Sequence, residues 1–162
     1  MYLTYPKDTF TYQYLAGPVE TPEEVETIRE GNCRMALQVY FYQLHRRFFA
    51  RDEIYLPGGY KVWGEFIFEE IDFRPDELRP GDVIYAEGIR GKTGQPIDKS
   101  RGRYADHDEW LYHLHSVNYI GQSRPGGPHY IWHATHIDGG TAVWTWDKFL
   151  HYFKPVSAKR VI

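Results

Sequence analysis

The apolar residues of the chain repeat at helical spacing near its N-terminal end and follow strand-like patterns in its second half. The clearest helical repeat comprises Cys33, Ala36, Leu37, Tyr40, Leu44 and Phe48. Spacing of three and four residues places these side chains on one face of an α-helix. Asn32, directly before the repeat, is a favourable N-cap residue, and the cations at Arg46 and Arg47 suit a helix C-terminus. The pattern therefore predicts a long helix with Cys33 in its first turn.

A shorter helix is predicted before this one. Thr21 can cap it, Pro22 suits its first position, and Glu24 can complete a capping box. Because Gly31 suits a C-terminal cap, we expect this helix to end there. Residues 1–20 show no helical period, and we expect them to form an arm or irregular strands that lie against the domain.

The second half of the chain has the short apolar runs, bounded by turn residues, that are typical of strands. Strands are predicted at Val83–Ala86, Tyr112–Gly121, His129–Thr135, Thr141–Thr145 and Ser157–Ile162, with a short helix at Trp146–Phe153. The segment Lys61–Phe73 fits a helix or a pair of strands, and we favour the helix. Helices followed by antiparallel strands make an α+β fold.

The length of 162 residues suits a single domain. We expect an N-terminal arm at 1–20 and one domain at 21–162, with a polar surface loop at 89–109. Between residues 90 and 103 the loop carries five basic residues and one acidic residue. It could form a mobile flap that attracts an acidic substrate, but a solvated connection is the simpler interpretation.

The composition excludes several classes of protein. With 42% hydrophobic and 25% charged residues, the chain is not an intrinsically disordered one. No apolar stretch approaches the roughly 20 residues of a membrane helix, and Met1–Phe10 lacks a signal-peptide pattern. We therefore expect no membrane span and, by default, a cytoplasmic location. The net charge of −3 argues against a nucleic-acid partner.

The one cysteine and the histidines carry the candidate chemistry. A single cysteine, Cys33, excludes a disulfide within the chain and a zinc site with several cysteines. Six of the eight histidines lie between His107 and His136, in the strand-rich half. A helix N-terminus favours a thiolate, a neighbouring imidazole can take its proton, and a third polar group can orient that imidazole. A buried, inert cysteine is the alternative interpretation.

Five short segments of the chain resemble motifs of the NlpC/P60 family of papain-like cysteine peptidases. The segment Gly31–Arg34, followed by an aromatic-rich helix, resembles the helix that carries the family's nucleophile. Arg79–Tyr85 resembles its strand of Pro-Gly-Asp followed by apolar residues, and His115–Gly121 matches its histidine strand at five of seven positions. Ile131–Ala134 is similar to its following strand, and the C-terminal Lys159–Ile162 to its closing strand.

This resemblance implies a papain-like NlpC/P60 fold, with N-terminal helices packed on an antiparallel β-sheet. It also implies that Cys33 is the nucleophile, His115 the general base and His133 the residue that orients it. The family usually has Asp before the cysteine, which helps to hold a free amine of the substrate, and Ser-Gly after it. Here Asn32 precedes Cys33 and Arg34 follows it, and these departures concern the substrate class more than the chemistry.

Other assignments of the histidines remain open. His113 shares a strand face with His115 and is a second candidate for the base, while His129 and His136 compete with His133 for the third position. The histidines His113, His115, His133 and His136 could instead bind Zn²⁺, but no carboxylate or cysteine motif accompanies them. We therefore expect no metal and no cofactor.

The sequence thus predicts a cysteine hydrolase that cleaves an amide bond through a thioester. By the family resemblance, its substrate is a peptide or cell-wall fragment, and the bond is a γ-glutamyl-type link in a peptidoglycan stem peptide. Two alternatives remain: a non-catalytic binding module on the same fold, and a papain-like acyltransferase or amidase that acts on lipid or protein.

Overall fold

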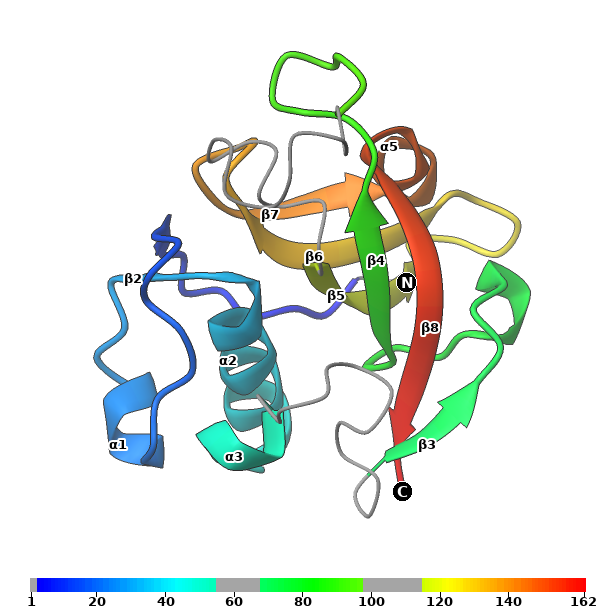
Figure 1. The fold of residues 1–162 in the computed structure, drawn as a ribbon. Helices are drawn as coiled ribbons and strands as arrows, with labels where there is room; N and C mark the ends of the chain where they lie inside the picture. Colours follow the sequence, from blue (N-terminus) through cyan, green and yellow to red (C-terminus); the bar gives the residue numbers. More distant parts are fainter. Residues whose placement is uncertain (1–2, 55–67, 98–114) are drawn as a thin grey trace.

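An eight-stranded sheet forms the centre of the molecule, as seen in a computed structural model that describes residues 3–54, 68–97 and 115–162 (Figure 1). The order of the strands is β2-β1-β7-β6-β5-β4-β8-β3. Their bounds are β1 Thr11–Tyr12, β2 Glu30–Gly31, β3 Phe68–Ile71, β4 Val83–Gly88, β5 His115–Gln122, β6 His129–Thr135, β7 Gly140–Thr145 and β8 Phe153–Val161. The strands from β4 to β7 form an antiparallel meander, and β8 returns to pair with the outer side of β4.

The helices in the described part of the chain are few. They are α1 Pro22–Val25, α2 Cys33–His45, α3 Arg51–Ile54 and α5 Trp146–Tyr152, together with a 3-10 turn at Pro75–Glu77. Short helices and one large sheet confirm the α+β class. No helix of the described residues is long and apolar enough to cross a membrane.

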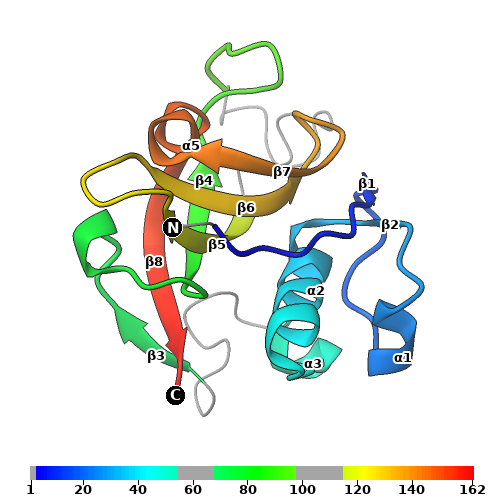
Figure 2. The same cartoon turned by 180° about the vertical axis from the view of Figure 1, so that it is seen from behind.

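Two apolar clusters lie on opposite faces of the sheet, one beneath α2 and one beneath α5. The first joins Leu37 and Tyr40 of α2 to sheet residues that include Trp132. The second joins Phe149 of α5 to another set of sheet residues that includes Val117. The two views show α2 beside the sheet and α5 across its other side (Figures 1 and 2). Each strand between them therefore presents alternate residues to α2 and to α5.

The predicted helix at Cys33 is confirmed, but it is more deeply buried than a helix with one apolar face. Its first nine residues, Cys33 to Phe41, are all buried. The side chain of Gln38 shows why: it exchanges two hydrogen bonds with the backbone of Val19, at 2.7 and 2.8 Å, and donates a third to the carbonyl of Phe49. The N-terminal segment thus packs over the side of α2 that faces away from the sheet.

Helix boundaries differ from the sequence prediction at two places. The first helix ends at Val25, and Gly31 lies in β2 rather than at a helix cap. Glycine is needed there for close approach, because a Cβ at this position would lie 2.6 Å from Cγ of Met35. The second helix ends at His45 because Arg46 adopts a left-handed conformation with φ 53°, so Phe48 lies beyond the helix.

The preference for a helix at Lys61–Phe73 is wrong for its last part. Phe68–Ile71 is strand β3, which pairs with β8 in register from Phe68 opposite Val161 to Ile71 opposite Ala158. The strand is stabilised by a partner some 90 residues away, which local periodicity does not encode. The remainder of the segment, 61–67, lies outside the described residues.

The strand predictions agree more closely with the structure. His129–Thr135 is strand β6 with the predicted bounds, whereas β4 continues to Gly88 and β8 begins already at Phe153. Of the predicted polar loop at 89–109, residues 89–97 form a tight turn closed by a bridge between Arg90 and Pro96. The rest of the loop and the start of the predicted strand, 112–114, lie outside the described residues.

A buried ion pair joins the beginning of β4 to the end of β8. The carboxylate of Asp82 is 2% exposed and accepts two hydrogen bonds from Arg160, at 2.9 and 2.8 Å. It also accepts the backbone N–H of Arg79 at 2.7 Å, which closes the turn before β4. This is the acidic residue of the Pro-Gly-Asp motif, and its role is to fix the turn and the neighbouring strand together.

We predict that Asp82→Ala lowers the free energy of unfolding by about 3 kcal/mol, because it leaves the Arg160 guanidinium and the Arg79 N–H without their acceptor. Urea denaturation measures this change. Asp76→Ala, at a side chain that is 94% exposed, is the matched control and should cost less than about 0.5 kcal/mol. Equal losses in the two variants would contradict the structural role of Asp82.

Candidate active site

Cys33 lies in the first turn of α2, where the sequence places it. The side-chain oxygen of Asn32 accepts hydrogen bonds from the backbone N–H groups of Arg34 and Met35, at 3.0 and 3.1 Å. The Asn32 amide in turn donates to the carbonyl of Tyr14 at 3.2 Å, so the cap is held by the N-terminal segment. Cys33 itself is 8% exposed. Its position is therefore fixed by the Asn32 cap and by the N-terminal segment that holds this cap.

His115 and His133 form a buried pair on neighbouring strands. Nε2 of His115 and Nδ1 of His133 are 2.7 Å apart, a hydrogen-bond distance. The His115 ring stacks on Phe153 with a centroid distance of 4.4 Å, and the His133 ring meets Trp144 edge-on at 4.4 Å. These aromatic contacts fix both imidazole planes, so the two candidate histidines are held in one orientation.

Burial makes both imidazoles neutral. Removal from water, followed by the charge of the nearby Arg34 guanidinium, lowers the pKa of His115 from 6.5 to about 3. The pKa of His133 is held well below its usual value by burial, then by His115 and Lys148. Each ring therefore carries one N–H at neutral pH. In the 2.7 Å contact, the N–H of one ring can donate to the nitrogen lone pair of the other.

Two contacts bring the beginning of α2 against the beginning of β5. Ser116 donates a hydrogen bond from Oγ to the carbonyl of Cys33, at 3.2 Å. Arg34, the next residue of the helix, acts electrostatically on His115, the residue before Ser116. The backbones of Cys33 and His115 are therefore parts of two adjoining segments, although 82 residues separate them in sequence.

The side chains of these two segments point to different faces of the sheet. Ser116 points to α2, so His115, its neighbour in an extended strand, points to the opposite face, where it meets Phe153. The thiol of Cys33 makes no hydrogen bond with the described residues. The structure thus joins His115 to His133 and places Cys33 beside their strands, while the thiol and the imidazoles are not in hydrogen-bond contact.

The other candidate histidines occupy separate environments. His136 is buried on the α2 side, where its ring lies 5.9 Å from that of Tyr12. His129 begins β6, and its Nδ1 is 2.6 Å from the hydroxyl of Tyr119. His113 lies outside the described residues. Among the residues that the structure describes, no group of three His, Cys, Asp or Glu side chains could hold a metal ion.

Two residues near Cys33 are absent from the sequence-based candidates. Arg34 is buried with its guanidinium 4.9 Å from the centre of the Tyr85 ring, and its Nη1 finds no hydrogen-bond partner in the described part of the chain. Tyr12 approaches from β1, and burial followed by the charge of Cys33 raises its pKa. Arg34 is visible in the sequence as a departure from the family motif, but its burial beside Tyr85 is not. Tyr12 has no local signal, since only the sheet brings it to Cys33.

Comparison with known proteins gives no precedent for this site. No family model, no curated protein and no solved structure matches the chain. The likeness to NlpC/P60 peptidases therefore rests on the five short segments, and the function must be argued from the site.

The buried, neutral His115 predicts a loss of stability in acid. The unfolded chain protonates this residue near pH 6.5 and the folded chain only near pH 3, so the unfolded state binds more protons between these values. Stability is therefore fully present above pH 6.5 and decreases as the pH falls toward 3. Between pH 7 and pH 5 the contribution of His115 falls by about 2 kcal/mol.

Urea denaturation of His115→Gln at both pH values tests this prediction. The variant should lose about 2 kcal/mol less than the unaltered chain on acidification, because glutamine does not titrate. His151→Gln, at an exposed histidine, is the control and should behave like the unaltered chain. Identical pH dependence in all three proteins would show that His115 is not buried as a neutral ring.

Proposed function

We propose that the chain is a cysteine hydrolase of papain-like, NlpC/P60 type that cleaves an amide bond in a peptide or cell-wall fragment. The observation that carries the proposal is the buried pair of His115 and His133, 2.7 Å apart, on strands that adjoin Cys33 at the capped beginning of α2. A nucleophile, a base and a residue that orients the base are the three parts that this chemistry requires.

The tautomer of the histidine pair determines how the base works. If Nε2–H of His115 donates to Nδ1 of His133, the other nitrogen of His115, Nδ1, is left as a proton acceptor. That nitrogen makes no hydrogen bond with the described residues. His133 then acts as a positioning residue, since it holds the tautomer and the plane of His115 without touching the substrate.

The proposed cleavage has two steps, acylation of Cys33 and hydrolysis of the thioester. Nδ1 of His115 takes the proton of the Cys33 thiol as Sγ attacks the carbonyl carbon, and the proton passes to the leaving amine as the C–N bond breaks. Water then attacks the thioester, His115 takes its proton, and the carboxylic acid and the free thiol are released. For this transfer Sγ and Nδ1 must come within hydrogen-bond distance. Substrate binding must therefore bring together the Cys33 thiol and the His115 ring, which point to different faces of the sheet without substrate.

The beginning of α2 supplies a donor for the oxyanion. Asn32 accepts the N–H groups of Arg34 and Met35, so its side chain does not cap the N–H of Cys33. That N–H lies at the positive end of a 13-residue helix. It is suitably placed to stabilise the negative oxygen that forms when Sγ attacks the adjacent carbonyl.

Two residues of the helix start bear on the substrate class. Asn32 lacks the negative charge with which the family holds a free amine, and Arg34 adds a positive charge with no carboxylate partner in the described residues. A buried guanidinium without a counterion favours an anion beside it. Both features favour a substrate with an acidic group near the scissile bond, and a γ-glutamyl stem peptide carries carboxylates there.

A second candidate is a non-catalytic binding module on the same fold. Two observations favour it: the Cys33 thiol has no imidazole partner among the described residues, and a pKa of about 3 makes His115 a weak base. The reactivity of the thiol separates the two candidates, because only the enzyme needs an activated Cys33.

Alkylation by iodoacetamide measures this reactivity. For the hydrolase we expect Cys33 to react at pH 6.5 at least about tenfold faster than a cysteine in an unstructured peptide, because a catalytic nucleophile must be more reactive than an ordinary thiol. Arg34→Gln should slow the reaction, while Arg124→Gln, an exposed arginine of the β5–β6 connection, should not. A rate equal to that of the peptide would support the binding module.

Hydrolysis of a γ-glutamyl stem peptide tests the roles of the histidines. Cys33→Ala should abolish activity, His115→Ala should lower kcat about 100-fold or more, and His133→Ala should have the next largest effect. Circular dichroism of each variant controls for folding. A larger loss in His136→Ala than in His133→Ala would assign the base to the α2 side of the sheet and contradict the pairing proposed here.

A further inference from the structure

Arg34, the residue after Cys33, is a buried cation that is not paired with a carboxylate. Its side chain is 8% exposed, and its Nη1 has no hydrogen-bond partner within residues 3–54, 68–97 and 115–162. The guanidinium lies 4.9 Å from the centre of the Tyr85 ring. Such a contact recovers only part of the hydration that a cation loses on burial. A further group is therefore required to balance this charge.

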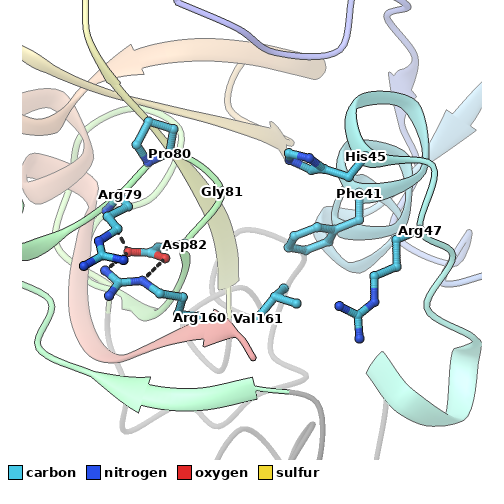
Figure 3. Close-up of a pocket in the computed structure, with 9 residues that line it drawn as sticks. All are labelled: Phe41, His45, Arg47, Arg79, Pro80, Gly81, Asp82, Arg160 and Val161. Carbon is cyan, nitrogen blue, oxygen red and sulfur yellow. Dashed lines mark hydrogen bonds and ion pairs between the residues drawn. The ribbon is translucent and has the colours of Figure 1, made fainter.

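The arginines around the pocket at the C-terminal end of α2 are satisfied in other ways. Arg160 donates two hydrogen bonds to the carboxylate of Asp82, at 2.9 and 2.8 Å (Figure 3). Arg47 and Arg79, which line the same pocket, are exposed, so water can hydrate them. Arg34 has no carboxylate partner in the part of the chain that the structure describes, and it is buried. Of these four arginines, it is therefore the one that requires an external partner.

Two serines lie on either side of Tyr85, on the face of the sheet that meets α2. Tyr85 is opposite Ser116 of β5 and opposite Ser157 of β8. Side chains directly opposite in antiparallel strands share a face and lie about 5 Å apart at Cβ. The Ser116 hydroxyl donates to the carbonyl of Cys33, at 3.2 Å, whereas Oγ of Ser157 is buried with no partner in those same ranges. Arg34 and Ser157 therefore both adjoin Tyr85 and both have donors to satisfy.

The buried charges near this position are positive in sum. Among the residues whose burial the structure describes, the buried cations are Arg34 and Lys159, and the buried carboxylate is Asp82, which is paired with Arg160. Lys159 is two residues after Ser157 in β8 and so lies on the same face of the sheet. Glu87, two residues after Tyr85 in β4, is only half-buried and forms no ion pair with Arg34. This face therefore favours a negative charge.

The atoms to be satisfied are donors, and they are enclosed. A guanidinium N–H and a hydroxyl both require an acceptor, and a negative acceptor also balances the buried charge. Unsatisfied buried polar groups in native proteins commonly mark a bound ion or water molecule. A monatomic anion accepts hydrogen bonds from any direction and has no carbon part to accommodate beneath the helix. These requirements favour chloride over an organic acid.

We propose that Arg34 and Ser157 form a buried binding site for a chloride ion at the beginning of α2. The ion accepts an N–H of Arg34 and the hydroxyl of Ser157 beside the Tyr85 ring, and it supplies the missing negative charge. The site is argued from buried charge and does not depend on the chemistry of Cys33. In the hydrolase proposed above, the acidic group of the substrate takes the place of this ion.

Urea denaturation of the full chain at constant ionic strength tests the proposal. Sodium gluconate, whose anion is too large for an enclosed site, is replaced stepwise by sodium chloride. Above the dissociation constant, a tenfold rise in chloride should lower the unfolding equilibrium constant about tenfold, because one ion binds the folded chain. Sodium bromide should act in the same way.

Matched variants locate the ion. Arg34→Gln should remove the chloride dependence, and Ser157→Ala, which deletes only a hydroxyl, should weaken chloride binding about tenfold or more. Arg124→Gln, at an exposed arginine, and Cys33→Ser should respond to chloride like the unaltered chain. Crystals soaked in bromide give a measurement that needs no variant: the anomalous peak should lie between Arg34 and Ser157.

Three results would overturn the chloride site. One is identical unfolding in gluconate and in chloride, which would leave water as the partner of Arg34. Another is an unchanged chloride dependence in Arg34→Gln, which would indicate binding elsewhere on the molecule. The third is loss of the dependence in Cys33→Ser with Ser157→Ala unaffected, which would place the ion at the thiol. Failure of the hydrolase proposal alone changes none of the expected results, because unfolding is measured and not activity.

Discussion

The burial of α2 is the constraint on which the rest of the molecule depends. The sheet covers one side of the helix through Leu37 and Tyr40, and the N-terminal segment covers another through the three hydrogen bonds of Gln38. A helix enclosed in this way cannot slide or turn without breaking both sets of contacts. Its ends are therefore fixed: the carbonyl of Cys33 accepts a hydrogen bond from Ser116 of β5 at one end, and Arg46 ends the helix in a left-handed conformation at the other.

The alternation of side chains along β5 divides the chemistry between the two faces of the sheet. Ser116 takes the position that faces α2, and His115 and His133 are left to pack with Phe153 and Trp144 on the α5 face. Complete burial in that aromatic cluster is what lowers the pKa of both imidazoles. The same packing that orients the histidine pair thus weakens it as a base, and the proposed catalysis by Cys33 requires the pair to become a stronger base when substrate binds.

Local signals predicted the parts of this arrangement that local interactions stabilise. The Asn32 cap and the helical repeat located α2, and alternation and turn residues located β6 and its neighbours, which brought His115 and His133 together. The errors occur where residues distant in sequence determine the local structure. Phe68–Ile71 is a strand because β8 is beside it, and Gly31 is a glycine because Met35 packs against it. Arg34 and Tyr12 join the site only through the tertiary fold, so no spacing rule could have found both.

Some positive charges of this molecule lie without a described carboxylate partner, although its net charge is negative. The chain carries a net charge of −3, which argues against a polyanionic partner over the whole surface, yet cations without a described carboxylate partner lie near both ends of α2. Arg34 lies in a buried setting, where an unpaired charge interacts far more strongly than it would in water. Local fields of this kind select ligands by the group that fits beside each guanidinium, and the net charge then acts only at longer range. We therefore expect the proposed substrate to be selected by an acidic group that fits beside Arg34, while the net charge disfavours an extended polyanion.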